Sequence, residues 1–87
     1  NLSKSFTIIT DNPDPICQVI VNDLGRSAST YRAEGIYTHM DHTAIMTTMS
    51  RQQGSRLQRV IREADPHAFV VITNTSQVIG KGFRGGN

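Results

Sequence analysis

The sequence contains one cysteine, few aromatic residues (6%) and no long hydrophobic run. Because Cys17 has no second cysteine to pair with, an intramolecular disulfide is excluded, and a reducing compartment is the simplest environment for the chain. A membrane-spanning helix needs roughly 20 consecutive apolar residues, and no segment approaches that length. The sequence also shows no signal-peptide pattern. These absences indicate a globular domain without a disulfide framework or a membrane span of its own.

The excess of positive over negative charge is also small. The chain has 9 Lys and Arg residues and 7 Asp and Glu residues, which give a net charge of +2. This excess is too small to predict a nucleic acid partner. Several arginines recur on the polar side of a helical pattern, and no aromatic residues are interleaved among them for base stacking. We interpret them as a solvated helix face and expect no nucleic acid partner; they are Arg51, Arg56, Arg59 and Arg62.

The 87 residues suffice for a single domain, but a domain this small buries only about 60% of the surface that its unfolded chain exposes. Its stability margin should be thin, which favours burial against a second copy or against another part of a longer protein. We expect a homo-oligomer. The unpaired edge of the second strand is the expected contact, with Tyr31 and Ile36 as participants.

The first third of the chain predicts a strand followed by a helix. Residues 5–10 alternate between apolar and polar side chains, and turn-forming residues with two prolines follow. Asn12 or Asp14 is expected to cap the helix, with proline at its first position. Gly25 supplies the left-handed residue that closes it. Cys17 is expected on the buried face of this helix, together with Ile16, Val19, Ile20 and Leu24.

The middle of the chain predicts a β-hairpin. Residues 27–38 are compatible with a strand that is kinked at Gly35. Residues 38–42 are polar and short enough for the turn, and residues 43–49 alternate as a second strand does.

A second helix and a last strand follow. Ser50 and Gln53 form a capping box, and Pro66 ends the helix because it removes a backbone donor and restricts Asp65 before it. Residues 68–73 are a continuous apolar run, which we interpret as a central or well-covered strand. The apolar face of the helix consists of Leu57, Val60, Ile61 and Ala64.

The element order is strand, helix, strand, strand, helix, strand. This order predicts an α+β fold, a ferredoxin-like βαββαβ sandwich with a four-stranded antiparallel sheet and two helices on one face. The first and third strands should lie in the middle. Residues 1–87 are then one ferredoxin-like domain.

Several segments match the pattern of one family, namely FTIITDNP (6–13), EGIYT (34–38), SR (50–51), DPHAF (65–69) and VIGKGF (78–83). Together they resemble the C-terminal cytoplasmic domain of YitT-family bacterial membrane proteins. In that family the domain follows several transmembrane helices, is similar in fold to small-ligand-sensing domains and has no established activity. The sequence departs from the family pattern at Ala33 and His39, where relatives often carry glycine.

The resemblance implies that this chain is the C-terminal soluble fragment of a longer membrane protein, located at the cytoplasmic face of the bacterial cell membrane. The first residue, Asn1, is not a start methionine and fits this expectation. The expected function is a regulatory or ligand-sensing domain. Two alternatives are a purely structural oligomerisation module and a stand-alone nucleotide-binding signal protein, although the latter would need a long loop between the second and third strands.

Two segments are candidate sites for a small anionic ligand. Glycines around Lys81 and Arg84 allow backbone amides to wrap an anion, so Gly80, Lys81, Gly82 and Arg84 form the first candidate. A tail that packs Phe83 and frays beyond it explains the same residues. The second candidate is the turn of Asp11 and Asn12 before the first helix, for which simple helix capping is the alternative explanation.

The remaining candidate chemistry is weak. His39, Asp41 and His42 could ligate a divalent ion, but their spacing matches no strong motif, and an exposed polar hairpin is the preferred interpretation. No serine or cysteine has a histidine base at a recognisable spacing. We therefore expect a protein that is not an enzyme, with no catalytic residue, metal or cofactor.

Overall fold

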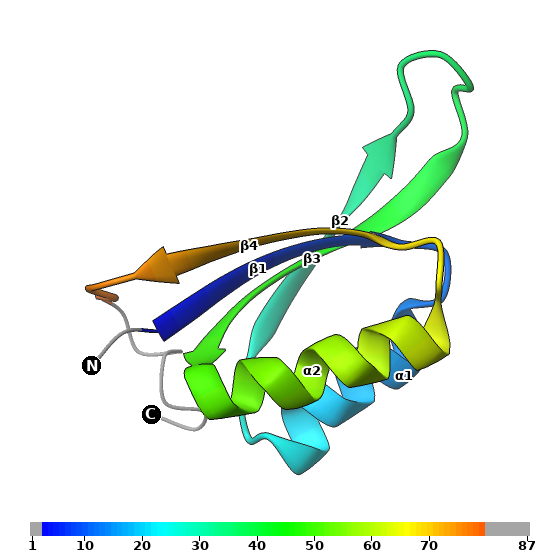
Figure 1. The fold of residues 1–87 in the computed structure, drawn as a ribbon. Helices are drawn as coiled ribbons and strands as arrows, with labels where there is room; N and C mark the ends of the chain where they lie inside the picture. Colours follow the sequence, from blue (N-terminus) through cyan, green and yellow to red (C-terminus); the bar gives the residue numbers. More distant parts are fainter. Residues whose placement is uncertain (1–2, 80–87) are drawn as a thin grey trace.

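The computed structural model describes residues 3–79. A four-stranded antiparallel sheet carries both helices on one face (Figure 1). The strand order is β2-β3-β1-β4, so β1 and β3 lie in the middle, as the sequence predicts. The elements are β1 (Ser3–Thr10), α1 (Pro13–Gln18), the π-helical η1 (Val19–Asp23), β2 (Ala28–Glu34), β3 (Asp41–Ser50), α2 (Arg51–Ala64) and β4 (Phe69–Thr75).

The core lies between the sheet and the helices. Alternate residues of β1 point toward the helices, and Phe6 and Ile8 are completely buried there. Burying each such side chain contributes roughly 1.5–3 kcal/mol to folding before entropy is counted. The core residues from the other elements are Ile16, Ile20, Ile45, Met49, Leu57 and Ile61.

The first helix begins and ends where the sequence predicts, but its start is stabilised differently. Pro13 occupies the first turn and Asn12 the N-cap position, yet the Asn12 side chain does not cap the helix. Its Nδ2 instead donates to the Ala64 carbonyl at the end of α2, 2.9 Å away. Helix α1 widens into η1, and Gly25, at φ 65°, closes it as expected.

The β2–β3 hairpin turns earlier than predicted. Strand β2 ends at Glu34 and not near residue 38, because the chain reverses over residues 35–40. His39 adopts a left-handed conformation (φ 56°) and its amide donates to the Gly35 carbonyl at 2.9 Å. Ile36 and Tyr37 therefore lie in the turn, where they are 84% and 96% exposed, and not in a strand.

Helix α2 has the predicted capping box. The backbone N–H of Gln53 donates to Ser50 Oγ at 3.2 Å, and the backbone N–H of Ser50 donates to Gln53 Oε1 at 3.0 Å. These two bonds satisfy orphan donors at the helix start. The helix ends before Asp65 and Pro66, as expected.

Strand β4 contradicts the prediction of a central or well-covered strand. It lies at the sheet edge and pairs only with β1 among the described strands. Val70 and Ile72 face the helices, whereas Phe69 and Val71 are 65% and 43% exposed on the other face. A continuous apolar run signals a strand, but it does not reveal how many neighbours that strand has.

Candidate ligand pocket between α2 and β4

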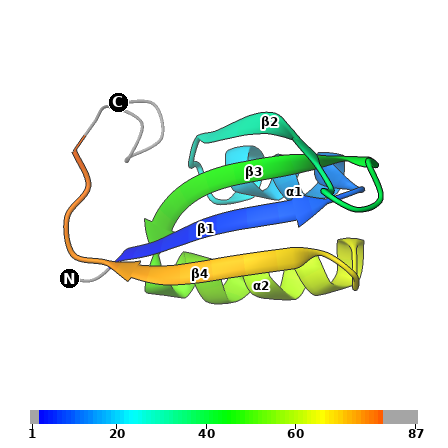
Figure 2. The same ribbon diagram turned by 90° about the horizontal axis from the view of Figure 1, so that it is seen from above.

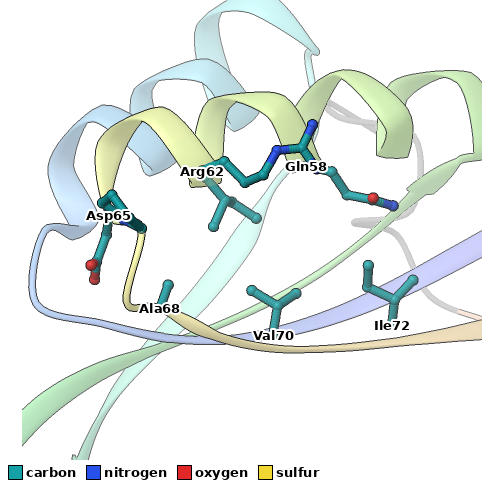
Figure 3. Close-up of a pocket in the computed structure, with 8 residues that line it drawn as sticks. Gln58, Arg62, Asp65, Ala68, Val70 and Ile72 are labelled. Atoms are coloured by element: carbon teal, nitrogen blue, oxygen red, sulfur yellow. The ribbon is translucent and has the colours of Figure 1, made fainter.

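A pocket of about 160 Å³ lies where the second half of α2 passes over β4 (Figure 3). Its apolar floor combines one residue of α2 with two residues of β4 and the alanine just before that strand. The floor consists of Ile61, Ala68, Val70 and Ile72, and the rim of Gln58, Arg62, Asp65 and Pro66.

The polar groups of the rim lie at two opposite ends of the pocket. Figure 3 shows Gln58 and Arg62 extending from α2 above Val70 and Ile72, with the Asp65 carboxylate directed away at the opposite end. Within residues 3–79, Arg62 forms no ion pair, and its guanidinium is exposed. One end of the pocket therefore offers an unpaired cation above an apolar floor.

Asp65 is held in place by three donors. Its Oδ2 accepts from the Thr10 hydroxyl at 2.7 Å and from the Asp11 amide at 3.2 Å, and its Oδ1 accepts from the His67 amide at 3.0 Å. The Thr10 bond, followed by the Asp11 bond, lowers the pKa of Asp65 below its ordinary value. This carboxylate therefore clamps the β1–α1 turn to the end of the pocket.

The predicted anion site at Asp11 and Asn12 adjoins this clamp. The Asp11 amide already donates to Asp65, and the Asn12 amide donates to the Thr10 hydroxyl at 3.0 Å. Asp11 Oδ1 lies 2.6 Å from His42 Nδ1. Both amides are thus occupied, and anion binding at this turn stays a prediction. The other predicted site, Gly80, Lys81, Gly82 and Arg84, lies outside the described residues.

The histidines and carboxylate of the hairpin do not converge. His39 contacts Glu34 at 2.9 Å, and Asp41 lies 4.0 Å from Arg32. His42 belongs to the separate pair with Asp11. Within residues 3–79 there is no group of three or more His, Cys, Asp or Glu side chains that could hold a metal ion.

A second hollow lies near the ends of β1, β2 and β3, and it is wider and more open than the first, with a volume of about 500 Å³. Its polar side chains form pairs within the hollow itself, Arg32 with Asp41 and the His42 imidazole with the Asp11 carboxylate. Because two carboxylates contribute to its lining, it suits an anion poorly. The smaller pocket is the better ligand site.

Cys17 is only partly buried, although the sequence predicts a buried helix face. Desolvation, with a smaller contribution from the nearby Asp14 charge, raises the pKa of its thiol. A thiol with a raised pKa is a poor nucleophile at neutral pH. The fully buried positions of this helical segment are Ile16 and Ile20.

Sequence reasoning missed the pocket. The sequence pattern predicts Arg62 on a solvated arginine face and predicts no role for Gln58, because helical periodicity does not indicate which end of a helix overlies which strand. The i, i+4 spacing of Gln58 and Arg62 is the one signal that places them on the same side of α2.

The comparisons with known proteins point to one family. Residues 26–80, more than half of the chain, match the family described as "Uncharacterized protein conserved in bacteria (DUF2179)". The UPF0750 membrane protein YdeO of Bacillus subtilis is 34% identical over 82 residues, which cover 94% of this chain and 28% of that protein. The UPF0750 membrane protein YitT of the same organism is 27% identical over 80 residues, 92% of this chain and 29% of that protein.

The resemblance to the YitT family is thereby confirmed. The chain spans 55% of the length of an uncharacterised protein of Bacillus sp. (strain PS3) that it also matches, and under a third of the two membrane proteins. No helix within residues 3–79 is long and apolar enough to cross a membrane.

Solved structures confirm the fold. A DUF2179 protein from Eubacterium ventriosum superposes with a TM-score of 0.66 at 20% identity, covering 82% of this chain and 97% of that one. A putative PII-like signaling protein from Thermus thermophilus gives 0.67 at 19% identity, with 85% and 86% covered. At these identities the likeness concerns the ferredoxin-like fold alone.

Proposed function

Because the chain belongs to the DUF2179 family, whose relatives YdeO and YitT are membrane proteins, we propose that it is the regulatory, ligand-sensing domain of a bacterial membrane protein and lies at its cytoplasmic face. The observation that carries the proposal is the pocket between α2 and β4, with its apolar floor and with Arg62, unpaired within residues 3–79, at the rim. No reaction chemistry enters this proposal.

The size of the pocket limits the ligand. About 160 Å³ is close to the volume of an engineered cavity, about 150 Å³, that binds benzene, and it is well below the roughly 300–1,000 Å³ of pockets for larger molecules. A branched alkyl group or a single ring fills it. A whole nucleotide is larger than this pocket.

The rim specifies the polar end of the ligand. Arg62 presents a planar fork of donors that matches a carboxylate, and the Gln58 amide, which extends above Ile72, adds another donor. A hydrogen bond to a charged group contributes about 1.5–3 kcal/mol, and the exposure of Arg62 places it at the low end of that range. The proposed ligand is a small carboxylic acid with an apolar side group, such as an apolar amino acid.

The hydrogen bonds of Asp65 connect the ligand pocket to the β1–α1 turn. Pro66 and Asp65 line the pocket, and Asp65 also binds the Thr10 hydroxyl and the Asp11 amide. A ligand that shifts the end of α2 would move the β1–α1 turn with it. The turn, which also contacts His42 through Asp11, is the proposed responsive element.

Thermal unfolding with a panel of small carboxylic acids, including apolar amino acids, tests the proposal. A true ligand at about 100 times its Kd should stabilise the domain by about 2.7 kcal/mol. Arg62→Gln should remove about half of this gain, because losing about 1.5 kcal/mol of binding raises the Kd roughly tenfold. Arg59→Gln is the matched control, because Arg59 is also exposed on α2 but does not line the pocket.

Three results would redirect or end the proposal. If no acid stabilises the wild-type domain, the ligand-sensing function is wrong. If Arg59→Gln weakens binding as much as Arg62→Gln, the pocket is not the site. If only the double variant Lys81→Gln, Arg84→Gln loses binding, the ligand binds at the C-terminal glycine-rich segment that the sequence predicts.

A further inference from the structure

The face of the sheet opposite the helices, called the open face below, has no described element over it. Figure 2 shows the helices behind the sheet, with the open face toward the viewer. Cross-strand partners form two rows that run across all four strands. The rows are Tyr31–Ala44–Ile9–Phe69 and Ser29–Met46–Thr7–Val71.

Large apolar side chains of these rows are left in contact with solvent. Tyr31 is 48% exposed, Met46 50%, Phe69 65% and Val71 43%. They belong to β2, β3 and β4, so the apolar surface extends from one sheet edge to the other. An exposed apolar surface that spans several strands marks an interaction site more often than a solvated one.

None of the strand residues on the open face is Lys, Arg, Asp or Glu, although these residues make up 18% of the chain. The charged residues of the four strands are Lys4, Arg32, Glu34 and Asp41, and the register places all of them on the helix side. The outward positions between the apolar residues are filled by serine, threonine, alanine and His42. A sheet face that stays in water usually carries polar and charged residues in alternation.

The absence of Lys, Arg, Asp and Glu narrows the choice of occupant. A nucleic acid or an anionic lipid surface would need basic residues, and a charged protein partner would have to bury its own charges unpaired. A second copy presents the same neutral face, so no charge is desolvated when the two meet. We propose that the open face packs against the open face of a second copy of this chain in a two-fold symmetric pair.

The available area agrees with a reversible pair. Strands lie about 4.8 Å apart and rise about 3.3 Å per residue, so four strands of seven paired residues cover roughly 19 by 23 Å, or roughly 440 Å². Two such faces remove roughly 900 Å² from solvent, just under the approximately 1,000 Å² expected of a stable interface. Association should therefore be concentration-dependent and not permanent.

This contact differs from edge pairing through β2, the contact that the sequence predicts. Strand β2 does lie at a sheet edge, but Ile36 lies in the turn beyond it. Edge pairing would use backbone groups of β2 and would not involve β4 at the opposite edge. A change on the exposed face of β4 therefore distinguishes the two contacts.

Sedimentation equilibrium of this chain tests the proposal, with Val71→Lys on the open face and Val21→Lys on η1 as the matched control. Both valines are exposed, at 43% and 55%, and both variants add one positive charge. The wild-type chain and Val21→Lys should form dimers with the same Kd at tens to hundreds of micromolar. Val71→Lys should raise the Kd at least about tenfold, because each copy would bury an unpaired ammonium group.

Circular dichroism checks that each variant is folded, and Met46→Lys, on β3 of the same face, provides a second measurement if Val71→Lys is not. Wild-type protein that stays monomeric at hundreds of micromolar overturns the proposal. Dimers that persist in both open-face variants also overturn it and assign the contact to a sheet edge or the helices. Binding of monomeric protein to lipid vesicles that both variants abolish would assign the face to a membrane instead.

Discussion

Asp65 is the residue on which the contacts of the pocket and of the β1–α1 turn converge. It lies at the end of α2, yet the Thr10 hydroxyl and the Asp11 amide that it binds come from 55 and 54 residues earlier in the chain. These donors favour the charged form, which is why the pKa of the carboxyl is lowered. A charge at this position stabilises a contact between two distant elements.

Asp65→Asn should lower the free energy of unfolding at pH 7 and reduce its dependence on pH. A folded-state pKa below the unfolded value of about 3.9 means that the unfolded state binds more protons between the two values, so stability rises with pH there. The contribution is present above about pH 4 and is lost as the pH falls through the folded pKa. Urea unfolding from pH 7 down to pH 3 measures it.

Glu63→Gln is the control for that experiment, because this neighbouring α2 side chain is exposed and forms no hydrogen bond or ion pair within residues 3–79. The difference between wild type and Asp65→Asn should shrink toward low pH, whereas Glu63→Gln should follow the wild type throughout. If the free energy of unfolding of Asp65→Asn stays below that of the wild type by the same amount at pH 3, the loss is caused by altered hydrogen-bond geometry and not by the missing charge.

At the scale of elements, α2 lies close to β1 at Gly54. A side-chain carbon at this position would lie 3.2 Å from Phe6 Cε1 and 3.3 Å from Lys4 Cγ. Alanine gains up to about 1 kcal/mol in helix propensity over glycine, but overpacking a core costs about 1–3 kcal/mol. Phe6 is completely buried and has little room to move.

We therefore expect Gly54→Ala to lower the free energy of unfolding by roughly 0–2 kcal/mol, because overpacking outweighs propensity. Chemical denaturation measures the change. Ser55→Ala, one residue along on the exposed side of α2, should be neutral or slightly stabilising. A stabilised Gly54→Ala variant would mean that α2 can move away from β1 at little cost.

The elements differ in how far the sequence could predict them. The capping box at Ser50 and Gln53 and the glycine at position 25 act locally, so α2 and the end of the first helix were predicted correctly. The hairpin turn was predicted too late in the chain. The residue type histidine does not indicate the left-handed backbone conformation that His39 adopts. The position of β4 and the pocket depend on which elements meet in space, and local patterns do not contain that information.

For the whole molecule, the proposed pair should make stability depend on protein concentration. Association stabilises the folded state by RT ln(1 + [L]/Kd), or about 1.4 kcal/mol when the free concentration is ten times the Kd. For a domain of this size, that corresponds to a rise in Tm of roughly 5–11 °C. Calorimetry over a concentration series should show this rise for the wild-type chain and Val21→Lys, and a much smaller rise for Val71→Lys.

The pairing of β1 with β4 also determines how the domain responds to tension. Ser3 lies opposite Thr75, so the described chain enters and leaves the sheet at the same end of two adjacent antiparallel strands. A force that separates these two residues pulls in the unzipping geometry. It breaks the β1–β4 hydrogen bonds one after another and does not load all of them at once, as shear would. The domain should therefore yield to weak mechanical force applied at these residues, whatever its resistance to heat.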